Sequence, residues 1–310
     1  MPTFSVSAIL DAAARGGCRI TENAPLAAAT TFRIGGPADL LIDAPDATAA
    51  AAVIAACRQS GAPLFYLGNG SNLLVGDRGI RGVVLRLDAR GKQPELLPDG
   101  TLRCDAGLPL QKVCLFAKEH ALTGLEFAYG IPGTVGGAVY MNAGAYGGEM
   151  ADVIAGAEAL DAAGHAVTLS ADDLALGYRH SALMERGEDD RLLLTAVTLR
   201  LSPGNTGEVA ARMAELLGRR KEKQPLDYPS AGSFFKRPEG HFAGALIENA
   251  GLKGYRVGGA AISDKHAGFV INYGGATAAD VRQLCRDVQE RILQKDGVRL
   301  EPEVRFVGEF

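Results

Sequence analysis

Residues 130–148 read GIPGTVGGAVYMNAGAYGG, and this glycine-rich stretch does more than any other to decide how the chain folds. Glycines surround the single proline at its start, and Asn142-Ala-Gly follows closely. Glycine adopts positive φ readily and lets another group approach the main chain. The stretch is therefore typical of a loop held against a ligand, and we expect little regular structure across residues 124–148.

A second glycine loop, GNGSN at residues 68–72, follows a predicted strand. Backbone N–H groups can converge on a phosphate at such a place. The loop is not a dinucleotide fingerprint, because Leu73 stands where the third glycine belongs. Taken alone it could be a plain turn, and the longer stretch could be an irregular loop packed on the core. Together, the two loops suggest that a diphosphate is held between them.

The bulk composition is that of an ordinary globular protein. The chain has 310 residues, 47% hydrophobic and 22% charged, with a net charge of −4. This length favours about two domains. Lysine and arginine are scattered, so no basic stripe indicates binding to nucleic acid or to an anionic membrane.

Cysteine usage and the N-terminus indicate a cytoplasmic protein. The five cysteines form no CxxC pair and no metal-type spacing, so we expect reduced thiols and no metal site. The N-terminal residues lack the pattern of a signal peptide, and no apolar run approaches the roughly 18–20 residues of a membrane helix.

The pattern of apolar residues predicts a mixed α and β chain with a boundary in the polar turn at 202–207. We expect an N-terminal domain over 1–202, with lobes of about 1–90 and 91–202, and a smaller domain over 203–310. Asp46 is a predicted N-cap, and Thr277 with Asp280 forms a capping-box pattern. Strands are predicted at 38–44, 63–68, 82–87, 101–107, within 154–170, at 191–201 and at 298–308, and helices at 47–61, 108–124, 208–226 and 277–296.

Residues 230–238, SAGSFFKRP, place one hydroxyl, Ser233, after Gly232 and before two phenylalanines. In an extended segment neighbouring side chains alternate sides. We therefore expect one phenylalanine to pack inward and the other to wall a cavity, while Gly232 allows close approach to the backbone. On these residues alone, Ser233 could be a hydrolase nucleophile or a proton donor.

The chain resembles the UDP-N-acetylenolpyruvoylglucosamine reductase family of bacterial cell-wall synthesis. The resemblance runs from about residue 25 to 308 in family order, and its motifs are highly specific together. They are TTFRIGGPADL, YLGNGSNLLV, LEFAYGIPGTVGGAVYMNAGAYGGEM, GYRHSAL, AGSFFKRP, LKGYRVGGAAISDKHAGFVIN and LEPEVRFVG. The chain looks like the shorter subtype, because no long insertion separates GYRHSAL from AGSFFKRP to carry a substrate-covering tyrosine loop.

The resemblance implies an α+β fold, with a two-lobed FAD-binding domain of the vanillyl-alcohol-oxidase type and a smaller α+β substrate-binding domain. It implies that NADPH reduces the flavin, whose N5 passes hydride to C3 of the enolpyruvyl ether of UDP-N-acetyl-3-O-(1-carboxyvinyl)glucosamine, giving UDP-N-acetylmuramate. The small-molecule substrate is the one partner that we expect. FAD contacts carried over from the motifs are Tyr66, Gly68, Asn69, Gly70, Ser71, Asn72, Leu73, Ile131, Pro132, Gly133, Thr134, Gly137, Ala138, Asn142 and Gly144.

Three residues match the catalytic positions of the family. Arg179 matches the arginine beside the substrate carboxylate, which a guanidinium can bind with two hydrogen bonds. Glu303 matches the glutamate that acts with it. Spacing along the closing strand also puts Glu301 and Arg305 on the same face, so the family pattern makes the choice of Glu303. Ser233 matches the proton donor to C2, and no base for a nucleophile is near in sequence.

Lys236, His266 and Arg305 are weaker candidates, and we expect them to contact substrate. FAD is expected to be non-covalent, because no histidine occurs between residues 34 and 119 for attachment. Two alternatives stay open at this point. One is an FAD-linked oxidase of a small alcohol or lactone, and the other is a non-enzymatic nucleotide-sugar-binding module, which would not need Arg179, Ser233 and Glu303 together.

Overall fold

The chain forms two compact units, each with its own hydrophobic core. The structure is a computed structural model, and it describes residues 5–310. The first unit comprises the chain up to Glu22, Asp39–Asn69 and Gly82–Gly218. The second comprises Asn23–Ala38, Gly70–Arg81 and Arg219–Phe310. These units do not follow the boundary predicted at residue 203, because two early segments bury Phe32, Ile34 and Leu74 in the core of the second unit.

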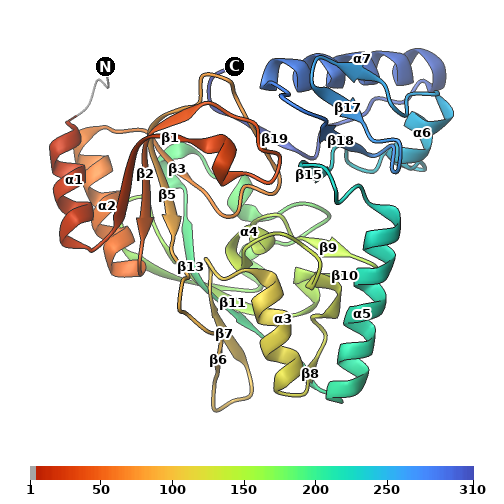
Figure 1. The fold of residues 1–310 in the computed structure, drawn as a ribbon. Coiled ribbons are helices and arrows are strands. Elements are labelled where there is room, and N and C mark those ends of the chain that lie inside the picture. Colours follow the sequence, from red (N-terminus) through yellow and green to blue (C-terminus); the bar gives the residue numbers. More distant parts are fainter. Residues whose placement is uncertain (1–4) are drawn as a thin grey trace. The chain divides into compact units, whose positions relative to one another are not determined.

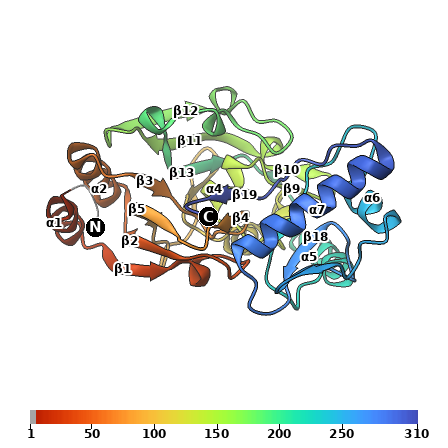
Figure 2. The same ribbon diagram turned by 90° about the horizontal axis from the view of Figure 1, so that it is seen from above.

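A four-stranded sheet forms one part of the first unit. Its strands are adjacent in the order β1 (Arg19–Pro25), β2 (Pro37–Ala44), β5 (Ile80–Leu87) and β3 (Leu64–Tyr66). Helices α1 (Val6–Arg15) and α2 (Ala47–Ser60) lie together beside this sheet in both views (Figures 1 and 2). As predicted, Asp46 caps α2, and its carboxylate accepts a hydrogen bond from the Ala49 N–H at 2.8 Å.

An antiparallel five-stranded sheet forms the other part of the first unit. Its order is β12 (Ala166–Ser170), β11 (Ile154–Leu160), β13 (Leu193–Leu199), β7 (Leu102–Asp105) and β6 (Glu95–Leu96). The predicted strand region 154–170 is thus a hairpin of two strands. Helix α3 (Leu110–Glu119) adds Leu110 and Val113 to the core of this unit. Short paired strands complete it: β8 (Leu122–Thr123) with β14 (Ser202–Pro203), and β9 (Gly144–Ala145) with β10 (Gly148–Glu149).

The glycine-rich stretch is more regular than predicted. It contains a helix, α4 (Val135–Tyr140), in addition to β9 and β10. Thr134 caps this helix, because its hydroxyl accepts a hydrogen bond from the Gly137 N–H at 3.2 Å. The expectation of little regular structure across residues 124–148 was therefore wrong at α4, where capping and the burial of Val135 and Val139 outweigh the low helix propensity of glycine.

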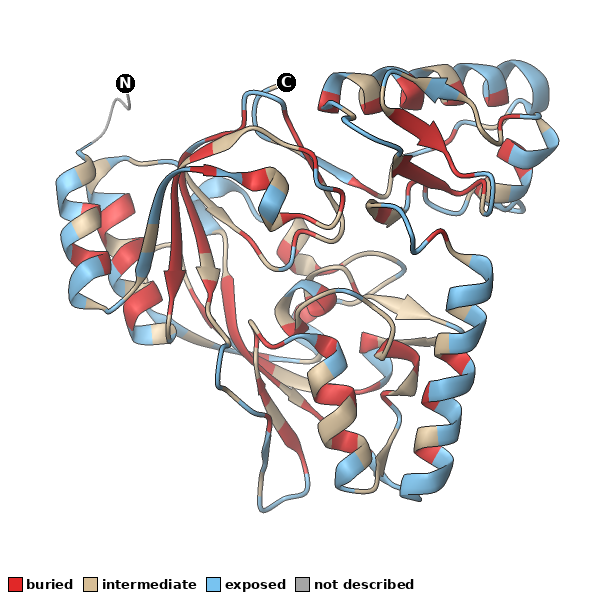
Figure 3. Cartoon of the chain, viewed as in Figure 1, coloured by how far each residue is buried: buried red, intermediate tan, exposed pale blue. Residues whose placement is uncertain are grey.

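The second unit is built on a four-stranded antiparallel sheet. Its order is β15 (Ser230–Ser233), β18 (Phe269–Asn272), β17 (Ala260–Ile262) and β16 (Arg256–Val257). Helix α7 (Ala278–Asp296) packs on β16 and β17, and α6 (Ala243–Asn249) contacts α7. The buried face of α7 and its exposed face are distinct (Figure 3). The predicted capping box is confirmed, since Thr277 and Asp280 hydrogen-bond each other's backbone N–H.

The closing strand is shorter than predicted. Only β19 (Arg305–Val307) is a strand, and it pairs in parallel with β4 (Leu73–Val75). Pro302 has no N–H to donate, so it interrupts the strand predicted over residues 298–308. Helix α5 (Thr206–Lys223) begins in the first unit and ends in the second.

The cysteines are free, as expected, and most of them are buried. Burial raises the pKa of Cys57, Cys104 and Cys285 to about 12, so these thiols stay protonated near neutral pH. Within residues 5–310, no helix is long and apolar enough to cross a bilayer.

Candidate active site

The predicted site residues are divided between the two units, and each group is described within its own unit. The first unit carries the flavin loops up to Asn69, the stretch from Ile131 to Gly144, and Arg179. The second unit carries Gly70 to Leu73 and the other predicted residues, which are Ser233, Lys236, His266, Glu303 and Arg305.

In the first unit the two glycine loops contact each other. The Asn69 side-chain Nδ2 donates a hydrogen bond to the carbonyl oxygen of Pro132 at 2.5 Å. A Cβ at Gly68 would lie 2.8 Å from the Thr134 Oγ1, so only glycine fits at this position without a shift. The two loops that the sequence assigned to one diphosphate are therefore neighbours.

The donors available to an anion lie mainly on the first loop. Among the described residues, the backbone N–H groups of Gly68, Asn69, Gly70 and Ser71 donate no hydrogen bond. Unpaired amide donors in a glycine loop are what a diphosphate needs. The start of α4 is different, because its N–H groups from Val135 to Ala138 already donate to Leu108, Ala106 and Thr134. The unpaired N–H groups of the first loop thus fit the diphosphate of FAD, whereas the N–H groups at the N-terminus of α4 are already hydrogen-bonded within the protein.

The remaining predicted flavin contacts of the first unit vary in exposure. Ile131, Gly133 and Gly144 are partly exposed, and Gly137 is exposed, whereas Ala138 is buried. Tyr66 lies in β3, where burial raises the pKa of its phenol and keeps it neutral.

Arg179 occupies a tight turn of the first unit. Gly177 and His180 exchange two backbone hydrogen bonds, each of 3.1 Å, which closes the turn around Arg179. Arg179 has a φ of 53°, in the left-handed region that few residues other than glycine adopt. Its guanidinium Nη2 donates to the carbonyl oxygen of Gly144 at 3.0 Å. Gly177 and His180 were not among the predicted site residues, although a glycine two residues before Arg179 is a signal for such a turn.

In the second unit Ser233 ends strand β15 beside an irregularity in the sheet. Ser230 pairs with Ile271 and Ser233 with Phe269, so β15 has one more residue than its partner across this interval. Gly232 supplies a φ of +80°, as such a bulge requires. A Cβ at Gly232 would meet no other atom of the protein within 4 Å, so its φ of +80°, and not a neighbouring segment of the chain, explains a glycine here. Bulges often re-aim a side chain, and here the affected residue is Ser233.

Ser233 is exposed, and its hydroxyl has no hydrogen-bond partner among the described residues. Phe234 and Phe235 behave differently from the expectation. Both are buried in the core of the second unit and meet edge to face, with ring centroids 5.1 Å apart. The prediction that one ring walls a cavity was therefore wrong, because the segment after the bulge is covered on both faces.

Glu303 lies beside the segment that follows Ser233. Its N–H donates to the carbonyl oxygen of Phe234 at 2.8 Å, and the Lys236 N–H donates to that of Glu301, also at 2.8 Å. Its carbonyl oxygen accepts from the side chain of Asn72 at 3.0 Å. The structure thus brings the segments of Ser233 and Glu303 together. The expectation that Glu301, Glu303 and Arg305 share one face of a continuous strand was wrong, because Glu301 and Glu303 precede β19.

The predicted substrate contacts of the second unit are less distinctive. Lys236 is exposed, with its ammonium 3.4 Å from the Glu301 carboxylate. His266 is half-buried, and its Nδ1 accepts a hydrogen bond from the Gly268 N–H at 3.1 Å. Burial lowers the pKa of His266, which favours the neutral ring. Arg305 is exposed in β19.

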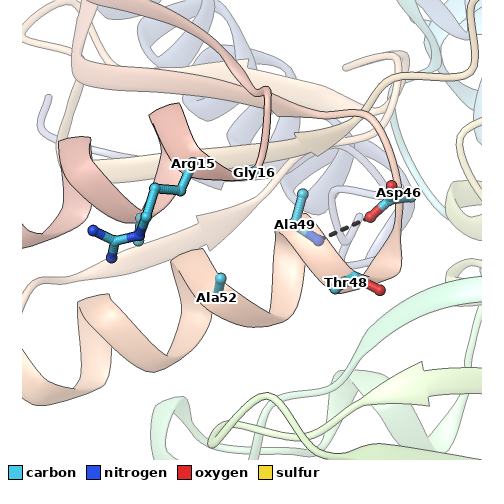
Figure 4. A pocket seen from close by; sticks show the side chains of 7 residues that line it. Arg15, Gly16, Asp46, Thr48, Ala49 and Ala52 are labelled. Atoms are coloured by element: carbon cyan, nitrogen blue, oxygen red, sulfur yellow. Dashed lines mark hydrogen bonds between the residues drawn. The ribbon is translucent and has the colours of Figure 1, made fainter.

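A pocket lies at the contact of α1 and α2 in the first unit (Figure 4). It is lined by Ala12, Arg15, Gly16, Asp46, Thr48, Ala49 and Ala52. None of these is a predicted site residue, and the Asp46 carboxylate is already used as the cap of α2. Among residues 5–310 no group of three metal-ligating side chains is close enough to hold an ion.

Comparison with known proteins assigns the class first. A model of the FAD-binding domain matches residues 38–170, which include the loop at 68–72 and the whole glycine-rich stretch at 130–148, so the chain is a flavoprotein. A second model, the C-terminal domain of UDP-N-acetylenolpyruvoylglucosamine reductase, matches residues 224–307.

Whole-chain relatives then give the family. The chain is 49% identical to the UDP-N-acetylenolpyruvoylglucosamine reductase of Agathobacter rectalis, over 94% of this chain and 95% of that protein. It is 48% identical to that of Caldanaerobacter subterraneus, over 93% of each. The crystal structure of the Thermus caldophilus enzyme superposes with a TM-score of 0.78 at 37% identity, covering 93% of this chain and 98% of that one. The chain belongs to the UDP-N-acetylenolpyruvoylglucosamine reductase family, which confirms the predicted family and the α+β fold class.

Proposed function

We propose that the chain reduces the enolpyruvyl ether of UDP-N-acetyl-3-O-(1-carboxyvinyl)glucosamine to UDP-N-acetylmuramate, with NADPH as the source of hydride. The observation that carries this is the identity of 49% over nearly the whole chain with a relative named for this reductase activity. When bound, FAD supplies the hydride-transfer chemistry that no side chain provides. Gly68 to Ser71, with their unpaired N–H groups, are the residues that we assign to its diphosphate.

The side chains then have two tasks. Hydride addition at C3 leaves negative charge at C2 and on the adjacent carboxylate of the substrate. We assign the stabilisation of this charge to Arg179, with Glu303 acting beside it on the carboxylate. We assign the proton that C2 must receive to Ser233. Its exposed hydroxyl, which has no partner among the described residues, supports this role.

The division of labour between the units is part of the same proposal. Most of the residues that we assign to FAD lie in the first unit, together with Arg179, whereas the second unit supplies Gly70 and Ser71 to the diphosphate and Ser233 and Glu303 to the substrate. Lys236 and Arg305 are exposed cations of the second unit that suit the anionic substrate. We also propose that the protein works in the cytoplasm, because its cysteines are free and mostly buried.

Stopped-flow absorbance tests the proposal. NADPH should bleach the visible flavin spectrum of the purified protein, and the enolpyruvyl substrate should restore it in the absence of oxygen. An FAD-linked oxidase would instead be reduced by a small alcohol and reoxidised by air. A protein without visible absorbance, or one whose reduced flavin ignores the enolpyruvyl compound, would overturn the proposed function.

A further inference from the structure

The side chain of Asn142 is committed to the protein rather than to a ligand. It is 0% exposed, although the sequence assigned it to FAD. Its Nδ2 donates to the carbonyl oxygen of Gly177 at 2.9 Å, and its Oδ1 accepts from the Ala151 N–H, also at 2.9 Å. Both polar groups of this amide are therefore occupied by main-chain atoms.

The carbonyl that Asn142 holds belongs to the turn that carries Arg179. Gly177 is the first residue of the backbone pair that closes this turn. The connection also runs the other way, because the Arg179 guanidinium donates to the carbonyl oxygen of Gly144, two residues after Asn142. Ser181, just beyond the turn, donates from its hydroxyl to the Tyr140 carbonyl at 2.6 Å. A further bond, of 3.5 Å, runs from the Arg179 Nη1 to the Asn142 carbonyl oxygen, so three side chains tie the turn to residues 140–144 by four hydrogen bonds.

The backbone of the turn needs this support. Arg179 has a φ of 53° and Asn142 a φ of 40°. Asparagine adopts this left-handed region more readily than other residues with a Cβ, whereas for arginine it is uncommon. Such conformations persist when the surrounding contacts determine them, and they concentrate at functional sites. The amide of Asn142 and the guanidinium of Arg179 each hold the segment from which the other projects.

We propose that Asn142 is a positioning residue for Arg179, fixing the turn at Gly177 so that the guanidinium is already in place when substrate binds. The inference rests on the proposed role of Arg179 in substrate reduction. It assigns to Asn142 a task different from the flavin contact predicted from its motif. A misplacement of about 1 Å at a reacting centre can cost roughly 100-fold in rate, so such a support matters for turnover.

Two variants of Asn142 test this in the FAD-loaded protein. Asn142→Asp keeps the size and the acceptor for Ala151 but replaces the donor that faces the Gly177 carbonyl. Asn142→Gly removes both bonds and tolerates the φ of 40°. The matched control is Asn272→Asp, the same chemical change at another asparagine whose amide bonds main-chain groups, in this case Phe32, Arg33 and Ala276 of the second unit.

We expect flavin reduction by NADPH to stay within about twofold of the parent, and reoxidation by substrate to slow by roughly 10- to 100-fold. Hydrogen exchange, measured by mass spectrometry, should become faster in peptides covering residues 177–181 and stay unchanged in α7. Asn142→Asp should add little to the loss in Arg179→Ala, because residues that act as a unit are not additive. The Asn272→Asp control should show none of these changes.

Several outcomes would overturn the assignment. Release of FAD from Asn142→Asp, with unchanged exchange at 177–181, would restore the flavin contact. Additive losses in the double variant would show that Asn142 acts apart from Arg179. If Arg179→Ala slows reoxidation and neither Asn142 variant does, the positioning role of Asn142 is refuted, while the proposed function of the protein stands. If Arg179→Ala itself is harmless, the role of Arg179 fails, and the positioning role fails with it.

Discussion

Replacing Ser233 by alanine should separate catalysis from stability more cleanly than any other single change. The side chain is exposed, and its hydroxyl has no partner among the described residues, so alanine loses no hydrogen bond and leaves no cavity. Surface changes of this kind usually alter the free energy of unfolding by at most about 0.5 kcal/mol. The bulge at Gly232 and the buried Phe234 and Phe235 should keep the local backbone in place.

The expected loss of activity is much larger. General acid catalysis contributes roughly 10²–10⁴-fold to a rate. At about 1.36 kcal/mol for each factor of ten, this corresponds to roughly 2.7–5.4 kcal/mol of activation free energy. The effect on turnover should therefore exceed the effect on stability at least fivefold. Flavin reduction by NADPH should remain near the parent rate, because that half-reaction needs no proton at C2 of the substrate.

Urea unfolding measures the free energy of unfolding, and stopped-flow kinetics measures the rates of flavin reduction and reoxidation. The mass of the intact protein shows whether a covalent adduct forms on Ser233. Ser230→Ala, on the same strand, is the matched control and should change neither half-reaction. Ser233→Cys places a thiol at nearly the same point and should recover part of the activity. An alanine variant that turns over within a few-fold of the parent would refute the proton-donor assignment. A covalent adduct on Ser233 during turnover would identify it as a nucleophile instead.

Arg179→Ala and Glu303→Ala should each raise the barrier to flavin reoxidation by substrate by roughly 2.7–4 kcal/mol, with little change in flavin reduction by NADPH. Equal losses in both half-reactions would point to binding or folding instead. FAD should be released completely when the protein is precipitated with acid, and yellow colour left on the chain would contradict non-covalent binding. Burial holds the pKa of folded His266 below its ordinary 6.5, so the stability that the neutral ring contributes is complete above about pH 6.5 and is lost as the pH falls through the lower folded value. His266→Asn, whose carbonyl can replace Nδ1 as acceptor for Gly268, should flatten this part of the unfolding curve measured against pH; an unchanged slope would assign the pH dependence to other groups.

Local patterns predicted the elements that depend on neighbouring residues. The cap at Asp46 and the capping box at Thr277 each depend on residues within three or four consecutive positions, and both were predicted correctly. Helix α4 was missed because its glycines disfavour a helix in isolation, whereas the packing of Val135 and Val139 favours it. The strand at 298–308 was too long because the alternation of apolar residues continued through Pro302.

Within the candidate site, motifs identified residues but not their surroundings. Asn142 lies in the glycine-rich stretch, and nothing local indicates that its amide bonds residue 177, 35 positions away. Likewise, one phenylalanine after Ser233 was expected to pack inward and the other to wall a cavity, but long-range packing buries both. Contacts of this sequence separation depend on the tertiary fold, so a pattern of neighbours cannot reveal them.

The chain changes from one compact unit to the other at residues 22, 38, 69, 81 and 218, and this has a consequence for synthesis on the ribosome. Phe32, Ile34 and Leu74 are made early, but most of the core that buries them lies between residues 231 and 304. These apolar side chains must wait, uncovered, until nearly the whole polypeptide has emerged. The C-terminal region that matches residues 224–307 is therefore a poor candidate for expression by itself, because β19 would lack its partner β4 and the core would lack three of its members.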